Sequence, residues 1–227
     1  MLKKKPIIIK ALLPITLLFI ILLASGITVR AEEEIYDWEG LRVRYENFLG
    51  EQSEENKKAL YNILPEKRFD RNIYHMKPKL LNYIFDNLDS LDHLAQKGDL
   101  LALKILFRLK FFSDGAVSTW INIMIGSSIT ANPENFLIAL EENLDKQNGI
   151  SSILANLGPD YVDKFKKQAE ALWQRYFAIK NVEINDVNNI SPSTKSISLY
   201  FLSSAIASAH KLDLYMSGNE DMIEKYR

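Results

Sequence analysis

Apolar side chains recur every three or four residues along most of this chain, which is the spacing of one buried face of an α-helix. The first such segment begins at Trp38, where the apolar positions are Leu41, Tyr45, Phe48 and Leu49. The alternation of Leu41, Val43 and Tyr45 would also suit a strand. We predict a helix here.

Capping residues predict where the next helices begin and end. Ser53 can cap a second helix, which ends near Pro65, and Pro78 can start a third that runs to Gly98. The apolar side chains of the third helix are Leu81, Ile84, Phe85, Leu88, Leu91 and Ala95. Asp99 is an N-cap for a helix that runs to about Phe112 and is apolar on nearly all sides. Such a helix is expected at the centre of the domain.

Similar signals divide the second half of the chain. Helices are expected from Asp114, from the N-cap and first turn formed by Asn132, Pro133 and Glu134, and after Gly149. Another should start at Pro159 and bury one face, made of Tyr161, Phe165, Ala169, Leu172, Trp173 and Tyr176. Residues 181–192 are rich in Asn, Asp and Ser and predict a loop before a long last helix over about 193–216. Small side chains in this last helix would allow another helix to approach closely.

These segments predict an all-α fold, with a single multi-helix domain arranged as an irregular helical bundle or a short α-solenoid. Short Gly- or Pro-marked turns favour antiparallel neighbours. The breaks at Gly98/Asp99 and Asn132/Pro133 lie about one helix pair apart. Residues 79–180 therefore resemble HEAT or armadillo helical repeats, although no consensus repeat is present and a compact irregular domain is the alternative.

The amino terminus has the pattern of an export signal. Lys3, Lys4 and Lys5 precede an apolar run over 11–24, and Val29 and Ala31 occupy the small-residue positions of a cleavage site. Residues 1–31 resemble a bacterial Sec-type signal peptide, which leaves residues 32–227 as the helical domain. The alternative is an uncleaved membrane anchor, in which case this segment makes the membrane contact. Both alternatives place the domain on the periplasmic or extracellular side of the bacterial inner membrane.

Charge and composition exclude several classes of function. The formal net charge of the 227 residues is −1, but 1–31 contain five cations and no acid, so the remainder has 23 basic and 29 acidic residues. A net charge of −6 disfavours nucleic acid as a partner. The chain has no cysteine, so it has no disulfide, thiolate metal site or cysteine nucleophile.

Candidate catalytic and metal-binding groups are sparse. Asp86, Asp89 and His93 would share a helix face, but three side chains on one helix do not complete a tetrahedral metal site, so we expect a solvated surface and no metal. We expect the same of Glu141, Glu142 and Asp145. No GxSxG, P-loop or GxGxxG motif is present, and no cofactor is expected.

Candidate partner-binding residues are the two cations Lys104 and Arg108 on the apolar central helix, and the aromatic pair Tyr36 and Trp38. We expect Lys104 and Arg108 to reach solvent; the alternatives are pairing with an acid such as Asp89 or Asp114, or binding a partner or an anion. Exposure of Trp38 is left open. Trp120 and Trp173 lie on apolar helix faces, where packing in the core is expected.

The sequence therefore favours an exported, non-enzymatic interaction or scaffold protein of the bacterial cell envelope, with another envelope protein as its partner. The alternative is an envelope hydrolase that acts on cell-wall material through a carboxylate pair assembled by the fold. A deep pocket with converging acids and a raised carboxylate pKa would favour the hydrolase. Whether the protein is an enzyme stays open at this stage.

Overall fold

The computed structural model describes residues 36–67, 76–146, 149–185 and 188–217. Within these residues the chain forms ten α-helices, two short 3-10 helices and no strand, which confirms the all-α prediction. In chain order these are α2 (Trp38–Gly50), α3 (Glu54–Ile63), α4 (Pro78–Phe85), α5 (Asp89–Gln96), α6 (Leu100–Leu109), η2 (Lys110–Phe112), α7 (Gly115–Ala131), α8 (Pro133–Glu141), α9 (Ile150–Ala155), η3 (Pro159–Tyr161), α10 (Phe165–Lys180) and α11 (Pro192–Met216).

The chain divides into two units, 1–40 and 41–227. In the first unit the described residues are 36–40, where the Asp37 carboxylate accepts the Gly40 amide at 2.7 Å. The export signal and its cleavage site at Ala31 lie outside the described residues and stay a prediction. None of the described helices is long and apolar enough to span a membrane.

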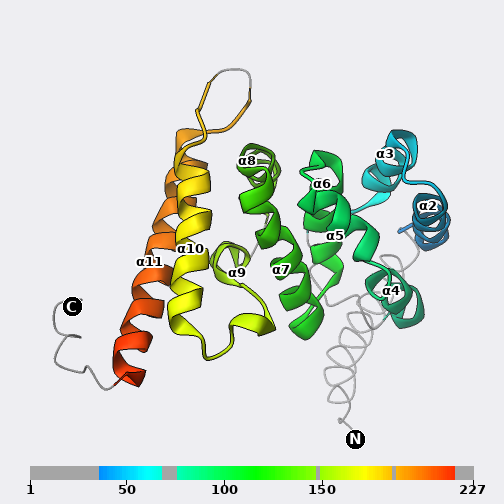
Figure 1. The fold of residues 1–227 in the computed structure, drawn as a ribbon. Helices are drawn as coiled ribbons and strands as arrows, with labels where there is room; N and C mark the ends of the chain where they lie inside the picture. Colours follow the sequence, from blue (N-terminus) through cyan, green and yellow to red (C-terminus); the bar gives the residue numbers. More distant parts are fainter. Residues whose placement is uncertain (1–35, 68–75, 147–148, 186–187, 218–227) are drawn as a thin grey trace, which may run out of the picture. The chain divides into compact units, whose positions relative to one another are not determined.

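In the second unit the helices pack in two rows (Figure 1). In one row α6 contacts α3 on one side and α8 on the other; in the other row α7 contacts α5 and α9. The chain alternates between the rows from α5 to α9. The hairpin of α10 and α11, whose helices lie side by side, contacts α8 and α9.

Helix α6 supplies the middle of the core, as its nearly all-round apolarity predicts. Its buried residues are Ala102, Leu103, Ile105, Leu106, Phe107 and Leu109. The predicted cap is also confirmed, since the Asp99 side chain accepts the Ala102 amide at 2.9 Å. Ser53 and Asn132 cap α3 and α8 in the same way.

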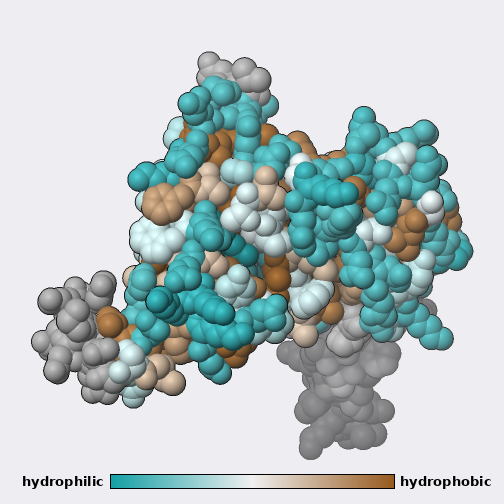
Figure 2. All heavy atoms as spheres, viewed as in Figure 1, coloured by the Kyte–Doolittle hydropathy of each residue, from teal (hydrophilic) through white to brown (hydrophobic). Residues whose placement is uncertain are grey.

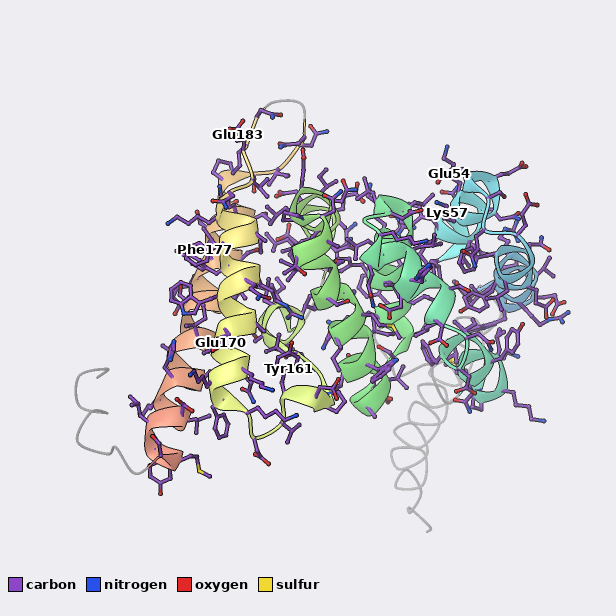
Figure 3. All side chains as sticks on the ribbon, in the orientation of Figure 1. Glu54, Lys57, Tyr161, Glu170, Phe177 and Glu183 are labelled. Carbon is purple, nitrogen blue, oxygen red and sulfur yellow. The ribbon has the colours of Figure 1, made fainter. Side chains whose placement is uncertain are left out.

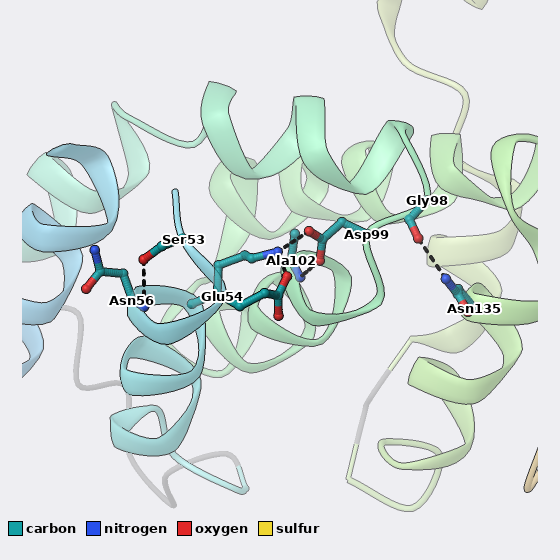
Figure 4. Close-up of polar contacts among 8 residues, drawn as sticks. Ser53, Glu54, Asn56, Gly98, Asp99, Ala102 and Asn135 are labelled. Atoms are coloured by element: carbon teal, nitrogen blue, oxygen red, sulfur yellow. Dashed lines mark hydrogen bonds and ion pairs between the residues drawn. The ribbon is translucent and has the colours of Figure 1, made fainter. Parts of the chain in front are cut away.

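The start of α6 also joins three helices through polar contacts (Figure 4). Lys57 of α3 is buried and contacts the carboxylates of Asp99 and Glu54. Burial alone would lower the pKa of Lys57, but these two carboxylates outweigh it and raise the pKa. On the other side, the Gly98 carbonyl accepts the Asn135 side-chain amide of α8 at 2.7 Å.

Two predicted helix boundaries are wrong. The single helix expected from Pro78 to Gly98 is two helices, α4 and α5, because the Tyr45 hydroxyl lies 3.0 Å from the Ile84 carbonyl and 2.8 Å from the Asn87 carbonyl at the break. The helix expected from Pro159 begins instead at Phe165. Asp163, with φ of 58°, interrupts the helical backbone between them.

Candidate functional site

The two cations expected to reach solvent are instead part of a polar cluster between α3, α6 and the end of α8. Lys104 contacts the Glu142 carboxylate, and its side chain is only 17% exposed. The Arg108 guanidinium lies 3.7 Å from the centroid of the Tyr61 ring and donates to the Tyr61 carbonyl at 3.0 Å and the Leu64 carbonyl at 3.1 Å. The expectation of solvent exposure is wrong, and the acid that pairs with Lys104 is neither Asp89 nor Asp114. A partner-binding role for these cations stays a prediction.

The aromatic pair Tyr36 and Trp38 belongs to the first unit. The two rings meet edge to face with their centroids 4.7 Å apart. The Trp38 amide also donates to the Tyr36 carbonyl at 2.8 Å. This local contact holds the two rings together.

The acidic features that would favour a hydrolase lie in two different parts of the described structure. The described part of the chain contains no group of three His, Cys, Asp or Glu side chains placed to hold a metal ion. Asp92 has a pKa raised by burial, and one of its carboxylate oxygens is buried without a hydrogen-bond partner. An open pocket of about 400 Å³ lies near the start of α8, and the acids that line it are Glu134 and Glu183. Asp92 does not line this pocket. The carboxylate with a raised pKa and the pocket lined by two acids are therefore at different places in the described structure.

Of the three acids expected to be solvated at the end of α8, Glu142 and Asp145 are exposed, but Glu141 is half-buried and hydrogen-bonded. Glu141 accepts the Ser191 amide at 3.0 Å and the Ser191 hydroxyl at 2.9 Å, where α11 begins. Burial tends to raise the pKa of Glu141, but these hydrogen bonds and one from Thr194 lower it below the ordinary value. Glu141 therefore has a structural role between α8 and α11.

The tryptophans expected in the core are exposed. Trp120 of α7 is 51% exposed and Trp173 of α10 is 39% exposed. On α10 the buried positions are Ala169, Leu172, Arg175 and Ile179. The buried face is rotated relative to the expected one, because Arg175 and not Tyr176 points into the protein.

Arg175 sets this rotation. Its side chain is 5% exposed and donates to the carbonyls of Leu154 at 2.7 Å and Asn156 at 3.0 Å, at the end of α9. A cation is favourable at the carboxyl end of a helix, where carbonyls lack partners within the helix. Burial lowers the pKa of Arg175 to about 10, so the guanidinium stays charged at neutral pH.

With Arg175 directed inward, α10 presents a row of side chains to solvent, which we call the α10 stripe: Glu170, Trp173, Phe177 and Lys180. Glu170 and Phe177 are labelled along this helix in Figure 3, and Figure 2 shows pale and brown side chains over α10 and α11 among hydrophilic ones. The Trp173 and Phe177 rings stack with centroids 5.4 Å apart and planes at 21°. Lys180 Nζ lies 6.0 Å from the Phe177 centroid.

Phe177, 49% exposed, is one of three members of this stripe that the sequence analysis missed, together with Glu170 and Lys180. The signal that could have found it is the spacing of three, four and three residues from Glu170 to Lys180. That spacing is typical of the seam of a helix that packs against another helix. No protein-family model, curated protein or solved structure matches the chain, so the stripe is interpreted from its own chemistry.

Proposed function

We propose that this protein is an exported, non-enzymatic interaction or scaffold protein of the bacterial cell envelope, and that the α10 stripe binds a helix of a partner protein. The location rests on the leader sequence in 1–31. The observation that supports the binding surface is the exposed, mutually stacked pair of Trp173 and Phe177.

Exposed, ordered aromatic side chains are typical of binding surfaces. Trp and Tyr are enriched among the residues that contribute most to protein interfaces, since a large rigid ring buries much apolar area at a small cost in conformational entropy. Trp173 and Phe177 are ordered against each other, and the Tyr176 ring meets both edge to face. A partner would therefore meet a surface that is already arranged for binding.

The spacing and charge of the stripe indicate the shape of the partner. Positions three and four residues apart form a straight seam on an α-helix, which fits the apolar face of a second helix. Glu170 precedes the aromatic pair and Lys180 follows it. A partner helix that carries a cation opposite Glu170, an acid opposite Lys180 and apolar side chains between them would fit both the spacing and the charges of the stripe.

Site-specific photo-cross-linking in intact cells tests this proposal. The photoreactive residue replaces Trp173 or Phe177 in the full chain, and the control replaces Trp120, which is also exposed but lies on α7 outside the stripe. Mass spectrometry then identifies the cross-linked peptide. We expect adducts from positions 173 and 177 on one face of a partner helix and none from position 120. Absence of adducts at 173 and 177, or equal labelling at 120, would contradict the proposed surface.

A further inference from the structure

The α10 stripe has a symmetric order of charges and rings about Arg175. Glu170 and Lys180 lie five residues before and after Arg175, and Trp173 and Phe177 lie two residues before and after it. At 1.5 Å per residue, the two charges are about 15 Å apart along the helix, with the two rings between them. This order is acid, ring, ring, base.

A second copy of α10 laid antiparallel across the stripe would match it at every position. The two-fold axis would cross the exposed face of α10 level with Arg175, whose side chain points the other way. Glu170 then meets the partner copy's Lys180, and Trp173 meets the partner copy's Phe177. The same contacts recur at the other end, which is the property of a two-fold interface. Each copy then covers both exposed rings of the other and pairs both end charges.

The parallel arrangement is disfavoured by the same residues. It would bring Glu170 against a second Glu170 and Lys180 against a second Lys180, and like charges across an interface select against that geometry. Neither Glu170 nor Lys180 takes part in an ion pair within the described residues, so both are available to a partner.

We infer that the helix bound by the α10 stripe is α10 of a second copy of this chain, packed antiparallel about a two-fold axis. This inference rests on the proposed function and names the partner of the same surface. The ends of the interface are the ion pairs between Glu170 and Lys180, and its centre is the four stacked rings. The protein is then a homodimer that can present two identical helical domains.

A charge-exchange series on the full chain, as matured in a bacterial host, tests the inference by analytical ultracentrifugation. We expect the wild-type chain to dimerise at or below about 100 μM, a threshold chosen for a small interface made by one helix face of each copy. Glu170→Lys and Lys180→Glu should each weaken dimerisation at least about tenfold, since each puts like charges at both ends of the interface. The double variant Glu170→Lys/Lys180→Glu should return to within about threefold of wild type.

The control is Lys58→Glu, which reverses an exposed charge on α3, away from the stripe, and should leave dimerisation unchanged within about twofold. Circular dichroism of each variant verifies that it is folded, and restoration in the double variant cannot come from misfolding. A wild-type chain that remains monomeric at about 100 μM would overturn the inference. So would a dimer that the charge variants leave unchanged. In either case, cross-links from Trp173 to a different protein would still support the proposed function.

Discussion

A methyl group added at Gly126 should destabilise this protein, although alanine is the better helix former. Gly126 lies in α7, where the Cβ of an alanine would be 2.5 Å from the Ile153 carbonyl oxygen and 2.9 Å from Arg175 Nη1. Both distances are shorter than van der Waals contact. The absence of a side chain at this position is what allows α9 and the Arg175 guanidinium to lie against α7.

The size of the effect follows from three contributions, one that favours alanine and two that oppose it. Helix propensity favours alanine over glycine by about 1 kcal/mol. Overpacking a filled interior costs about 1–3 kcal/mol, and the carbonyl of Ile153 belongs to the backbone of α9, so it cannot rotate away as a flexible side chain would. Displacing Arg175 would in addition leave the Leu154 and Asn156 carbonyls without their donor, at about 1–3 kcal/mol for a buried group. We expect Gly126→Ala to lower the free energy of unfolding by about 2 kcal/mol.

Urea denaturation followed by circular dichroism measures this difference, with Gly50→Ala as the matched control. Gly50 ends α2, and a Cβ there would meet no atom within 4 Å. We expect the control to leave stability unchanged or to raise it by up to about 1 kcal/mol, since alanine meets no clash there. If Gly126→Ala is as stable as wild type, α7 does not lie this close to α9, and Arg175 is not packed against Gly126.

The pKa values of Glu141 and Asp92 are shifted in opposite directions, so we expect the two acids to make stability depend on pH in opposite ways. The pKa of Glu141 is lowered in the folded protein, so Glu141 stabilises the fold at neutral pH, and this stability is lost as the pH falls through the folded pKa. Glu141→Gln should therefore lower the free energy of unfolding by about 1 kcal/mol at pH 7 and by less below about pH 4. The pKa of Asp92 is raised in the folded protein, so the fold is favoured at low pH and loses stability as the pH rises through the folded pKa. Asp92→Asn should therefore be more stable than wild type at pH 7 and equally stable at about pH 3. Urea titrations at both pH values would contradict either assignment if the difference between variant and wild type did not change with pH.

Much of the helical pattern could be predicted because its signals are local. An N-cap depends on a side chain and an amide three residues later, and Ser53, Asp99 and Asn132 all form the expected contact. The long last helix was expected over about 193–216 and is found at Pro192–Met216. The buried central position of α6 followed from its composition alone.

The errors arise where a distant part of the chain decides the outcome. The break between α4 and α5 depends on the Tyr45 hydroxyl, which lies about forty residues earlier and contacts two carbonyls there. The partners of Lys104 and Arg108 come from the end of α8 and the end of α3. Periodicity identifies an amphipathic helix, but it does not report which polar side chain finds a buried partner across the fold.

The small side chains of the last helix show the same limit. Of the six small side chains in this helix that could allow close approach of another helix, Ala209 is buried, Ala205 is half-buried, and Ser203, Ser204, Ala207 and Ser208 are exposed. Within α11 the buried positions are Thr194, Ser198, Leu202, Ile206 and Ala209. The spacing of the apolar residues alone did not distinguish these two faces, because small residues are compatible with either.

The buried Arg175 connects these observations to the candidate binding surface. An apolar-period argument assigns an arginine to solvent and a tryptophan to the core, and on α10 both assignments are reversed. The reversal is favourable because the Arg175 guanidinium donates to two carbonyls at the end of α9 and packs against Gly126, which has no side chain. Once Arg175 is directed inward, Trp173 and Phe177, two residues on either side of it, must turn outward, since residues two apart on a helix face nearly opposite directions. The exposed rings are thus a consequence of how α10 is anchored, and the centre of the proposed two-fold interface lies level with that anchor, Arg175.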